Sequence, residues 1–184
     1  MQFELVIYRV SGLSPLLQHN PEKLMRQPGG IGRKKIPTPE EEAEQGSYRL
    51  PDGQLYIKAK AFRAAILSAA KGKRIGRFSA KSIVAGAVLL ENETVPLIDP
   101  ETDEPLTSFE IHTERVVVQR QGILRSRPML RKWACDLPLM IDVEVADRVV
   151  VLGLLNEAGM RVGVGDYRIE RDGIYGRFEA EVKE

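Results

Sequence analysis

The segment near the end of the chain combines glycine, arginine and aromatic residues: AGMRVGVGDYRIERDGIYGRF, residues 158–178. Arginine neutralises phosphates and a tyrosine ring stacks on nucleobases, so this combination is typical of single-strand binding. We expect nucleic-acid contacts here from Arg161, Gly163, Gly165, Tyr167, Arg168 and Tyr175. In the alternative interpretation the rings are core residues and the glycines only shape turns, and for Phe178 we expect a core position.

The glycines of this segment have two expected uses. Gly159 is placed to end a helix in the left-handed conformation. Gly163 and Gly165 can form a sharp loop or let a ligand backbone approach, because glycine has no side chain to clash. Gly173 and Gly176 indicate a bulge or a close chain crossing. The segment has neither the dinucleotide-binding pattern nor a Walker lysine, so no nucleotide cofactor is expected.

The charges are segregated along the chain, although the net charge is only +1. Residues 53–90 hold eight basic residues and no acidic one, residues 91–114 hold eight acidic and no basic ones, and residues 115–132 are basic again. Separate charged faces follow from such blocks, and a positive face binds phosphates. We expect phosphate neutralisation by Lys58, Lys60, Arg63, Lys73, Arg74, Arg125 and Arg127, and a further nucleic-acid contact from Arg131. The alternative is that the blocks pair with each other inside the fold.

An arginine-rich segment precedes the only tryptophan, Trp133. We expect residues 120–132 to form a loop that clamps a strand of nucleic acid by charge and stacking. Alternatively, Trp133 anchors the loop in the core and the arginines pair with the acidic block.

Catalytic motifs are weak in this sequence. His19 and His112 are far apart, Cys135 is the single cysteine, and no serine lies in a nucleophile pattern. We therefore expect no enzyme, no metal site and no cofactor. A metal-independent ribonuclease using His19 is a minor alternative. Cys135 excludes an internal disulfide, no apolar run reaches the roughly 20 residues of a membrane span, and the N-terminus does not resemble a signal peptide. We expect a cytoplasmic protein without membrane contact.

The first half of the chain indicates a strand, an excursion and a helix. Residues 2–11 alternate with apolar residues on both faces, which predicts a central strand covered on both sides. Residues 12–47 form a long excursion with a basic tip at 33–35 and a short helix from Thr38 to Gly46 that opens with a capping box. After a turn at residues 51–53, a basic helix follows with its core face at Phe62, Ala65, Ile66 and Ala69.

The second half adds further strands and one helix. We expect a strand at 82–90, a loop or short hairpin arm at 91–113, and a strand at 115–124 broken at Gly122. Alternation predicts a strand at 138–145, with Val143 and Val145 inward and Asp142 outward. A helix follows from its cap Asp147 to Gly159, and a strand closes the chain.

This order predicts an α+β fold with a mainly antiparallel sheet. The simplest architecture is a ferredoxin-like or RNA-recognition-type core in one domain, residues 1–184, with insertions at 12–47 and 91–135.

Two motifs also resemble the RAMP superfamily, the RNA-binding backbone and processing subunits of CRISPR effector complexes, and related small phage and plasmid proteins. They are residues 57–61 (IKAKA) before the basic helix, which lack the family's proline and serines, and the glycine loops 163–165 and 173–178. The resemblance implies a modified RNA-recognition fold, binding of guide or other single-stranded RNA or DNA, and assembly as a homo-oligomer or as a subunit of a ribonucleoprotein complex. The alternative is a protein-interaction module of viral or plasmid origin that acts on a CRISPR-type complex without binding nucleic acid itself.

Overall fold

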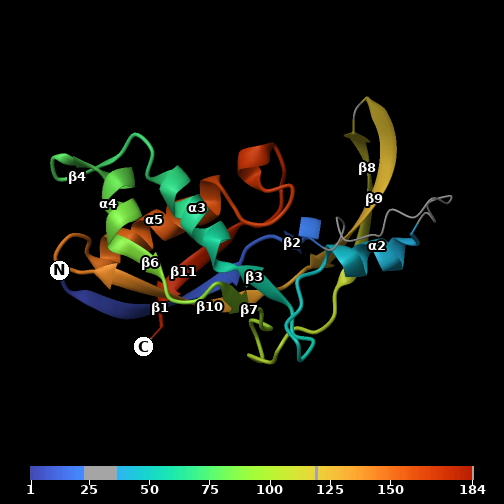
Figure 1. Ribbon diagram of the computed structural model, residues 1–184, viewed down its shortest axis with the longest axis horizontal. Helices are drawn as coiled ribbons and strands as arrows, with labels where there is room; N and C mark the ends of the chain where they lie inside the picture. Colours follow the sequence, from blue (N-terminus) through green and yellow to red (C-terminus); the bar gives the residue numbers. More distant parts are fainter. Residues whose placement is uncertain (23–36, 119, 184) are drawn as a thin grey trace.

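A four-stranded sheet forms the centre of the computed structural model, which describes residues 1–22, 37–118 and 120–183 (Figure 1). Its strands are β1 (Phe3–Gly12), β6 (Val88–Leu90), β10 (Ala134–Asp142) and β11 (Phe178–Val182), in the order β11-β1-β10-β6. Every neighbouring pair is antiparallel, with Val10 beside Cys135 on one side and Ala180 on the other. The expectation of an α+β protein with a mainly antiparallel sheet is confirmed. The basic tip expected at 33–35 lies outside the described residues.

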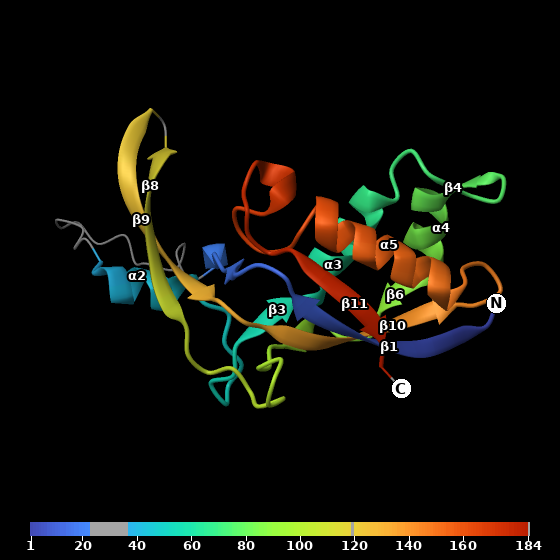
Figure 2. The ribbon, with the colours of Figure 1, turned by 180° about the vertical axis from the view of Figure 1, so that it is seen from behind.

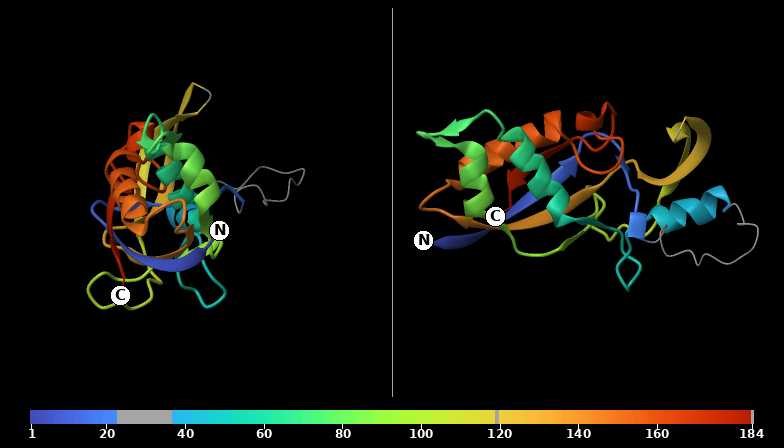
Figure 3. Two further views of the ribbon diagram at one scale, coloured as in Figure 1. Left: turned by 90° about the vertical axis from the view of Figure 1, so that its left-hand side faces the viewer. Right: turned by 45° about the horizontal axis from the view of Figure 1, so that its top comes forward.

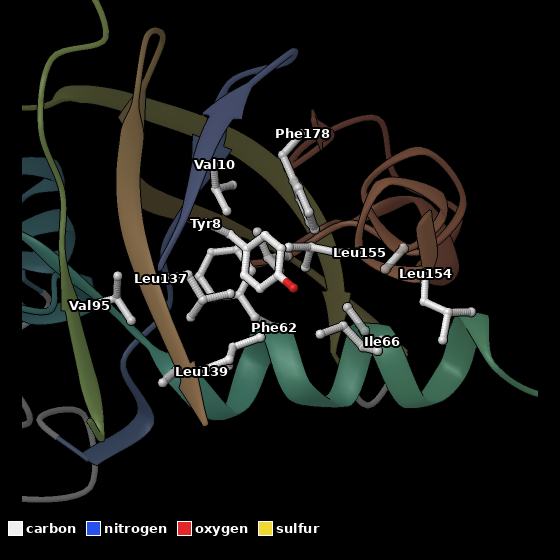
Figure 4. Close-up of a cluster of buried hydrophobic side chains, with 14 of the residues drawn as sticks. Tyr8, Val10, Phe62, Ile66, Val95, Leu137, Leu139, Leu154, Leu155 and Phe178 are labelled. Carbon is white, nitrogen blue, oxygen red and sulfur yellow. The ribbon is translucent and has the colours of Figure 1, made fainter. Parts of the chain in front are cut away.

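Three helices cover one face of this sheet: α3 (Ala59–Ala69), α4 (Ala80–Ala87) and α5 (Arg148–Arg161) (Figures 1 and 3). The predicted core face of α3 is confirmed, because Phe62, Ala65, Ile66 and Ala69 are all buried. Figure 4 shows Phe62 and Ile66 among side chains from the strands and from α5. Phe178 packs edge-on against Phe62, with 5.5 Å between ring centroids, which confirms its expected core position.

Among the described residues, no helix covers the opposite face of the sheet. Leu5, Ile7 and Leu89 are 52%, 37% and 42% exposed, whereas Val6, Tyr8 and Val10 on the other face of β1 are buried. The prediction that the first strand is covered on both sides is therefore wrong. Apolar residues on both faces of a strand normally indicate burial on both sides, but all three helices packed on the sheet lie against one face.

Helix α4 replaces most of the strand expected at 82–90. Ala80, Val84 and Ala87 are buried at helical spacing, and only Val88–Leu90 form a strand. Short apolar windows do not distinguish helix from strand by periodicity alone.

A long hairpin of β8 (Glu110–Val118) and β9 (Gln121–Leu130) projects from the body (Figure 2). The expected break at Gly122 and the expected loop at 120–132 are both wrong, because the turn comes earlier, where Arg120 has a φ of 66°. Gly122 lies within β9, and the Arg115 guanidinium packs where its side chain would be. Strand β2 (Leu16–Leu17) extends this second sheet.

Helix α2 (Pro39–Gly46) packs against β9. Its predicted capping box is confirmed: the Thr38 hydroxyl accepts from the Glu41 N–H at 3.2 Å, and the Glu41 carboxylate accepts from the Thr38 N–H at 3.0 Å. The turn at 51–53 is also present, with Gly53 at a φ of 89°. The predicted hairpin across this turn is short: Arg49 and Leu55 form an antiparallel bridge, and the Tyr56 N–H donates to the Tyr48 carbonyl at 3.0 Å. The strand after it, β3 (Tyr56–Lys58), also pairs with β7 (Thr94–Pro96).

The remaining elements correct three boundaries. Strand β10 begins at Ala134 and not at 138, and it ends at Asp142 and not at 145. The prediction that Asp142 points outward is wrong, because its carboxylate is buried and accepts the backbone N–H groups of Gln2 and Glu144. Val145 is 45% exposed instead of inward. Helix α5 begins after its predicted cap Asp147, but it continues to Arg161. The short pieces are β4 (Arg74–Ile75), β5 (Phe78–Ser79) and the 3₁₀ helix η1 (Ile169–Arg171).

Candidate functional site

A groove with a volume of about 530 Å³ lies between α3 and the segment that follows α5. Its buried lining is mostly apolar and includes Leu16, Ile57 and Val164, with Gln18 as a buried polar side chain. Lys58, Lys60 and Arg168 also line it. Apolar walls with convergent cations are the composition expected of a site for an anionic ligand with flat or apolar parts.

A second hollow, also about 530 Å³, adjoins this groove, because Ala64 and Glu170 line both. It adds Lys71 after the end of α3, Lys81 in the first turn of α4, and Arg171. We call the two hollows together the α3 groove. The α3 side chains Ala61 and Ala64 in its lining are short and leave the helix surface accessible.

The glycine loop is built differently from the sequence-based prediction. Gly159 lies inside α5, where a side chain would overlap the Phe178 carbonyl oxygen. Gly163 takes the left-handed position instead: it follows the cap residue Val162, has a φ of 71°, and donates its N–H to the Ala158 carbonyl at 2.9 Å. The helix therefore ends one turn later than predicted, and Gly163 turns the chain toward α3.

The other loop glycines serve close contacts within the protein. A side chain on Gly165 would lie 2.5 Å from the Leu17 carbonyl oxygen, and side chains on Gly173 and Gly176 would overlap the carbonyls of Tyr167 and Val164. The predicted close chain crossing at Gly173 and Gly176 is confirmed. Gly163 and Gly165 line the α3 groove, but the space that they leave open is filled mainly by this chain's own backbone.

Several cations of the α3 groove are unpaired. Within the described ranges, Lys60, Lys71 and Lys81 form no ion pair. The Glu170 carboxylate accepts hydrogen bonds from the Ser68 hydroxyl and from Arg168 at 3.2 Å, and these bonds, together with the nearby charges of Arg168 and Lys71, lower its pKa. The groove consequently keeps an excess of positive charge.

The N-termini of α3 and α4 add to this positive field. Neither helix has an acidic residue in its first turn or a side-chain cap, and lysines stand there instead: Lys58 and Lys60 in α3, Lys81 in α4. Cations near the positive end of the helix dipole are unfavourable for stability, and the same end attracts anions. By contrast, α2 opens with three glutamates and a capping box.

Lys58 is held beside an aromatic side chain of the groove. Its ammonium lies 5.3 Å from the centroid of the Tyr48 ring and contacts Glu22, and the hydrogen bond to Glu22 raises its pKa. Sequence reasoning missed Tyr48, because nothing in its local sequence links it to a helix that begins eleven residues later.

Seven of the ten predicted cations lie outside the lining of the α3 groove, and four of these, Arg63, Lys73, Arg74 and Arg161, belong to the helices and the β4–β5 hairpin or lie beside them. Arg63 donates to the Ala85 carbonyl of α4 at 2.9 Å, and Lys73 and Arg161 both pair with Glu157 of α5. Arg74 is exposed on β4.

The arginines predicted to clamp nucleic acid from a loop lie instead on β9 and just after it, and acidic groups hold them. Arg125 pairs with Glu42 at 2.8 Å and Arg131 with Glu110 at 2.8 Å. Arg127 is buried, pairs with Asp166 at 2.5 Å and stacks on the Tyr167 ring at 4.7 Å. The alternative interpretation is confirmed for Trp133, which is fully buried, and for Arg131, whose partner belongs to the acidic block. It fails for Arg125 and Arg127, whose partners lie elsewhere.

The two tyrosines predicted to stack on bases are half-buried. Tyr167 has the Arg127 guanidinium over its ring and a φ of 46°. Tyr175 packs edge-on against His112, with 5.6 Å between ring centroids. Internal groups therefore already contact both rings.

His19 also lines the α3 groove. Burial lowers its pKa, Arg127 and Arg125 lower it further, and the carboxylates of Asp166 and Glu42 oppose this shift. Among the described residues, no group of three or more histidine, cysteine or acidic side chains is arranged to hold a metal ion.

Comparison with known proteins finds neither a protein-family model nor a curated protein that matches this chain. Across the described residues, no helix has the length and apolar character needed to cross a membrane.

Proposed function

We propose that this protein binds single-stranded nucleic acid in the α3 groove, with RNA as the expected ligand and without catalysing a reaction. The observation that carries the proposal is the set of lysines that form no salt bridge in the described structure, Lys60, Lys71 and Lys81, which lie along α3, just after it and at the start of α4. A row of cations neutralises successive phosphates, and the apolar lining accommodates bases.

We further propose that the four-stranded sheet belongs to a ferredoxin-like, RNA-recognition-type core. In chain order, β1, β6, β10 and β11 are the first to fourth strands of the sheet, and they stand in the order 4-1-3-2. Helix α3 lies between the first two strands and α5 between the last two, which agrees with a βαββαβ unit. Helix α4 and the β8–β9 hairpin are then additions to this unit.

Distant kinship with the RAMP superfamily remains part of the proposal. Both motifs that carry the resemblance contribute to the α3 groove: the IKAKA segment through Ile57, Lys58, Lys60 and Ala61, and the first glycine loop through Gly163 and Gly165. In this view the protein is a subunit of a ribonucleoprotein complex or assembles with copies of itself along the strand.

Binding of labelled RNA and DNA oligonucleotides at several salt concentrations tests the proposal. We expect affinity to fall steeply with salt. The triple variant Lys60→Gln, Lys71→Gln, Lys81→Gln should reduce the slope of log K against log salt by about 2, since each phosphate neutralised on a single strand contributes about 0.7.

The matched control is Arg131→Gln with Lys132→Gln, which also removes exposed cations. These two pair with Glu110 and Glu101, so their loss should leave the slope unchanged. Absence of binding by the unmodified protein at low salt would reject the proposal.

A second candidate function is a protein-interaction module, and the uncovered face of the sheet favours it. Leu5, Ile7 and Leu89 form adjoining exposed positions there, together with half-buried Met140, which lies opposite both Leu5 and Leu89. A contiguous exposed apolar patch of this kind marks a contact with another protein more often than with nucleic acid. This candidate replaces the first if oligonucleotides do not bind to the protein and if Leu5→Lys abolishes its association with a subunit of a CRISPR-type complex.

A further inference from the structure

The β4–β5 hairpin presents an exposed phenylalanine that no packing role explains. Phe78 is 55% exposed, whereas Phe62 and Phe178 are fully buried. It is the only aromatic side chain among the exposed large hydrophobic residues of the described structure. Exposing a ring of this size forfeits burial free energy, and its position at the tip of a short hairpin leaves it accessible to an external contact.

Cations surround this ring. The Arg77 guanidinium lies 5.2 Å from the centroid of the Phe78 ring and covers one of its sides. Residues 71–81, KGKRIGRFSAK, contain five basic residues and no acidic one. Of these five, only Lys73 forms an ion pair within the described part of the chain. A flat ring among unpaired cations matches the two requirements of a stacked base and its phosphate.

The hairpin also continues the α3 groove. Lys71 and Lys81, which bracket it in the sequence, both line the second hollow. Its base is closed by the Ala80 N–H, which donates to the Lys73 carbonyl at 3.0 Å, and its turn is formed by Gly76 at a φ of 58°. Figure 3 shows the hairpin at the outer end of α4, on the helical side of the molecule. A strand that leaves the second hollow past these lysines reaches the hairpin.

We propose that Phe78 is a base-stacking platform at the end of the α3 groove, with Arg77 supporting the ring from one side. The inference rests on the proposed function and extends it, because stacking requires a base that is not already stacked in a duplex. It accordingly makes Phe78 a determinant of the preference for single over double strands. Insertion into an anionic membrane is less favoured, because Phe78 is the one strongly exposed apolar side chain of the hairpin and Ile75 beside it is half-buried.

The test compares Phe78→Leu with Phe78→Tyr. Leucine keeps an apolar side chain without a ring, and tyrosine keeps the ring. We expect Phe78→Leu to lower affinity for a single-stranded RNA by about 5-fold to 100-fold, the effect of losing one stacked base, with the salt slope unchanged. Phe78→Tyr should bind like the unmodified protein, and a duplex of the same sequence should bind equally to all three.

Oligonucleotide length gives a second readout. Across a series from about 4 to about 16 nucleotides, the range of site sizes for single-strand binding folds, the loss caused by Phe78→Leu should disappear for strands too short to reach the hairpin. The matched control is Leu124→Ala on the β8–β9 hairpin, where the side chain is 69% exposed. This variant should not change binding at any length.

The outcomes separate the two proposals. If the unmodified protein binds RNA and Phe78→Leu binds equally well, the stacking platform is rejected and the proposed function stands. If no oligonucleotide binds at low salt, the proposed function fails, and the platform fails with it. If phosphatidylserine vesicles bind to the unmodified protein but not to Phe78→Leu, while RNA does not bind, the exposed ring serves a membrane surface instead.

Discussion

Two basic blocks of this sequence look alike in composition and have opposite uses in the structure. The block from Arg115 to Lys132 places Arg125, Arg127 and Arg131 against carboxylates of the same chain. The block from Lys58 to Lys81 leaves most of its cations without an acidic partner in the described residues, along a groove and a hairpin. Charge count alone therefore does not locate a binding surface, because only unpaired charge is available to a ligand.

The physical difference lies in what each block faces. Strand β9 runs beside α2, which has three glutamates in its first turn, and toward the C-terminal loop that carries Asp166. Helix α3 turns one face to the core, and its Lys60 faces a hollow between helices and loop. Carboxylates reach the arginines of the first surface, whereas the two in the described lining of the second, Asp166 and Glu170, are already bound by Arg127 and by Ser68 with Arg168.

The largest effect that this comparison predicts is a loss of stability at Arg127. Its side chain is 8% exposed, and removing it leaves the Asp166 carboxylate without its cation and a gap over Tyr167. We expect Arg127→Ala to lower the free energy of unfolding by about 3 kcal/mol, as for other broken buried pairs. Urea denaturation of both proteins measures this difference.

Arg131→Ala is the matched comparison for this measurement. Arg131 also pairs with a carboxylate, but its side chain is 63% exposed, so its loss should cost less than about 1 kcal/mol. If both alanine variants lost the same free energy of unfolding, the assignment of Arg127 to an internal, structural role would be contradicted.

A smaller change in the free energy of unfolding, of opposite sign, is expected for a substitution at Lys60 in the α3 groove. Lys60 stands in the first turn of α3, where a cation opposes the helix dipole and an anion is favourable. Lys60→Glu should therefore raise the free energy of unfolding by about 0.3–1 kcal/mol while weakening oligonucleotide binding. Thermal denaturation measures the change in stability, and an oligonucleotide titration on the same samples measures the change in binding.

Lys60→Gln removes the charge without reversing it and should give an intermediate result in both measurements. If Lys60→Glu destabilised the protein, Lys60 would have a structural role, and the contrast between the two blocks would be lost at that position.

The smallest effect is the pH dependence of stability that His19 contributes, because its side chain is only half-buried. Burial lowers its pKa below the ordinary 6.5, so the unfolded chain binds the proton more readily than the folded one. Stability should consequently decrease as the pH falls through about 6.5 toward the lower folded-state pKa, and it should be complete above that range.

Unfolding free energies between about pH 8 and about pH 5 measure this dependence. His19→Gln should flatten it. A steeper loss of stability in His19→Gln would contradict burial as the cause of the shift.

Local interactions made several elements predictable from the sequence. The capping box of α2 and the Asp147 cap of α5 involve residues two or three positions apart, and both are present. The buried face of α3 follows from its helical spacing, because a helix brings such residues together whatever surrounds it. Local signals were ambiguous for residues 80–87 and at Gly159, and there the predictions were wrong.

Sequence by itself determined the α+β class, most of the strands and helices, and the segregation of charge, because these depend on side-chain type and on neighbours along the chain. Only the tertiary structure decided which cations are free. Arg127 and Asp166 form an ion pair although they are 39 residues apart in the sequence. Lys60 and Arg168 line the same groove although they lie on different elements. No local sequence pattern distinguishes these two cases. Electrostatic partners are set by distance in space, and that distance exists only once the chain has folded.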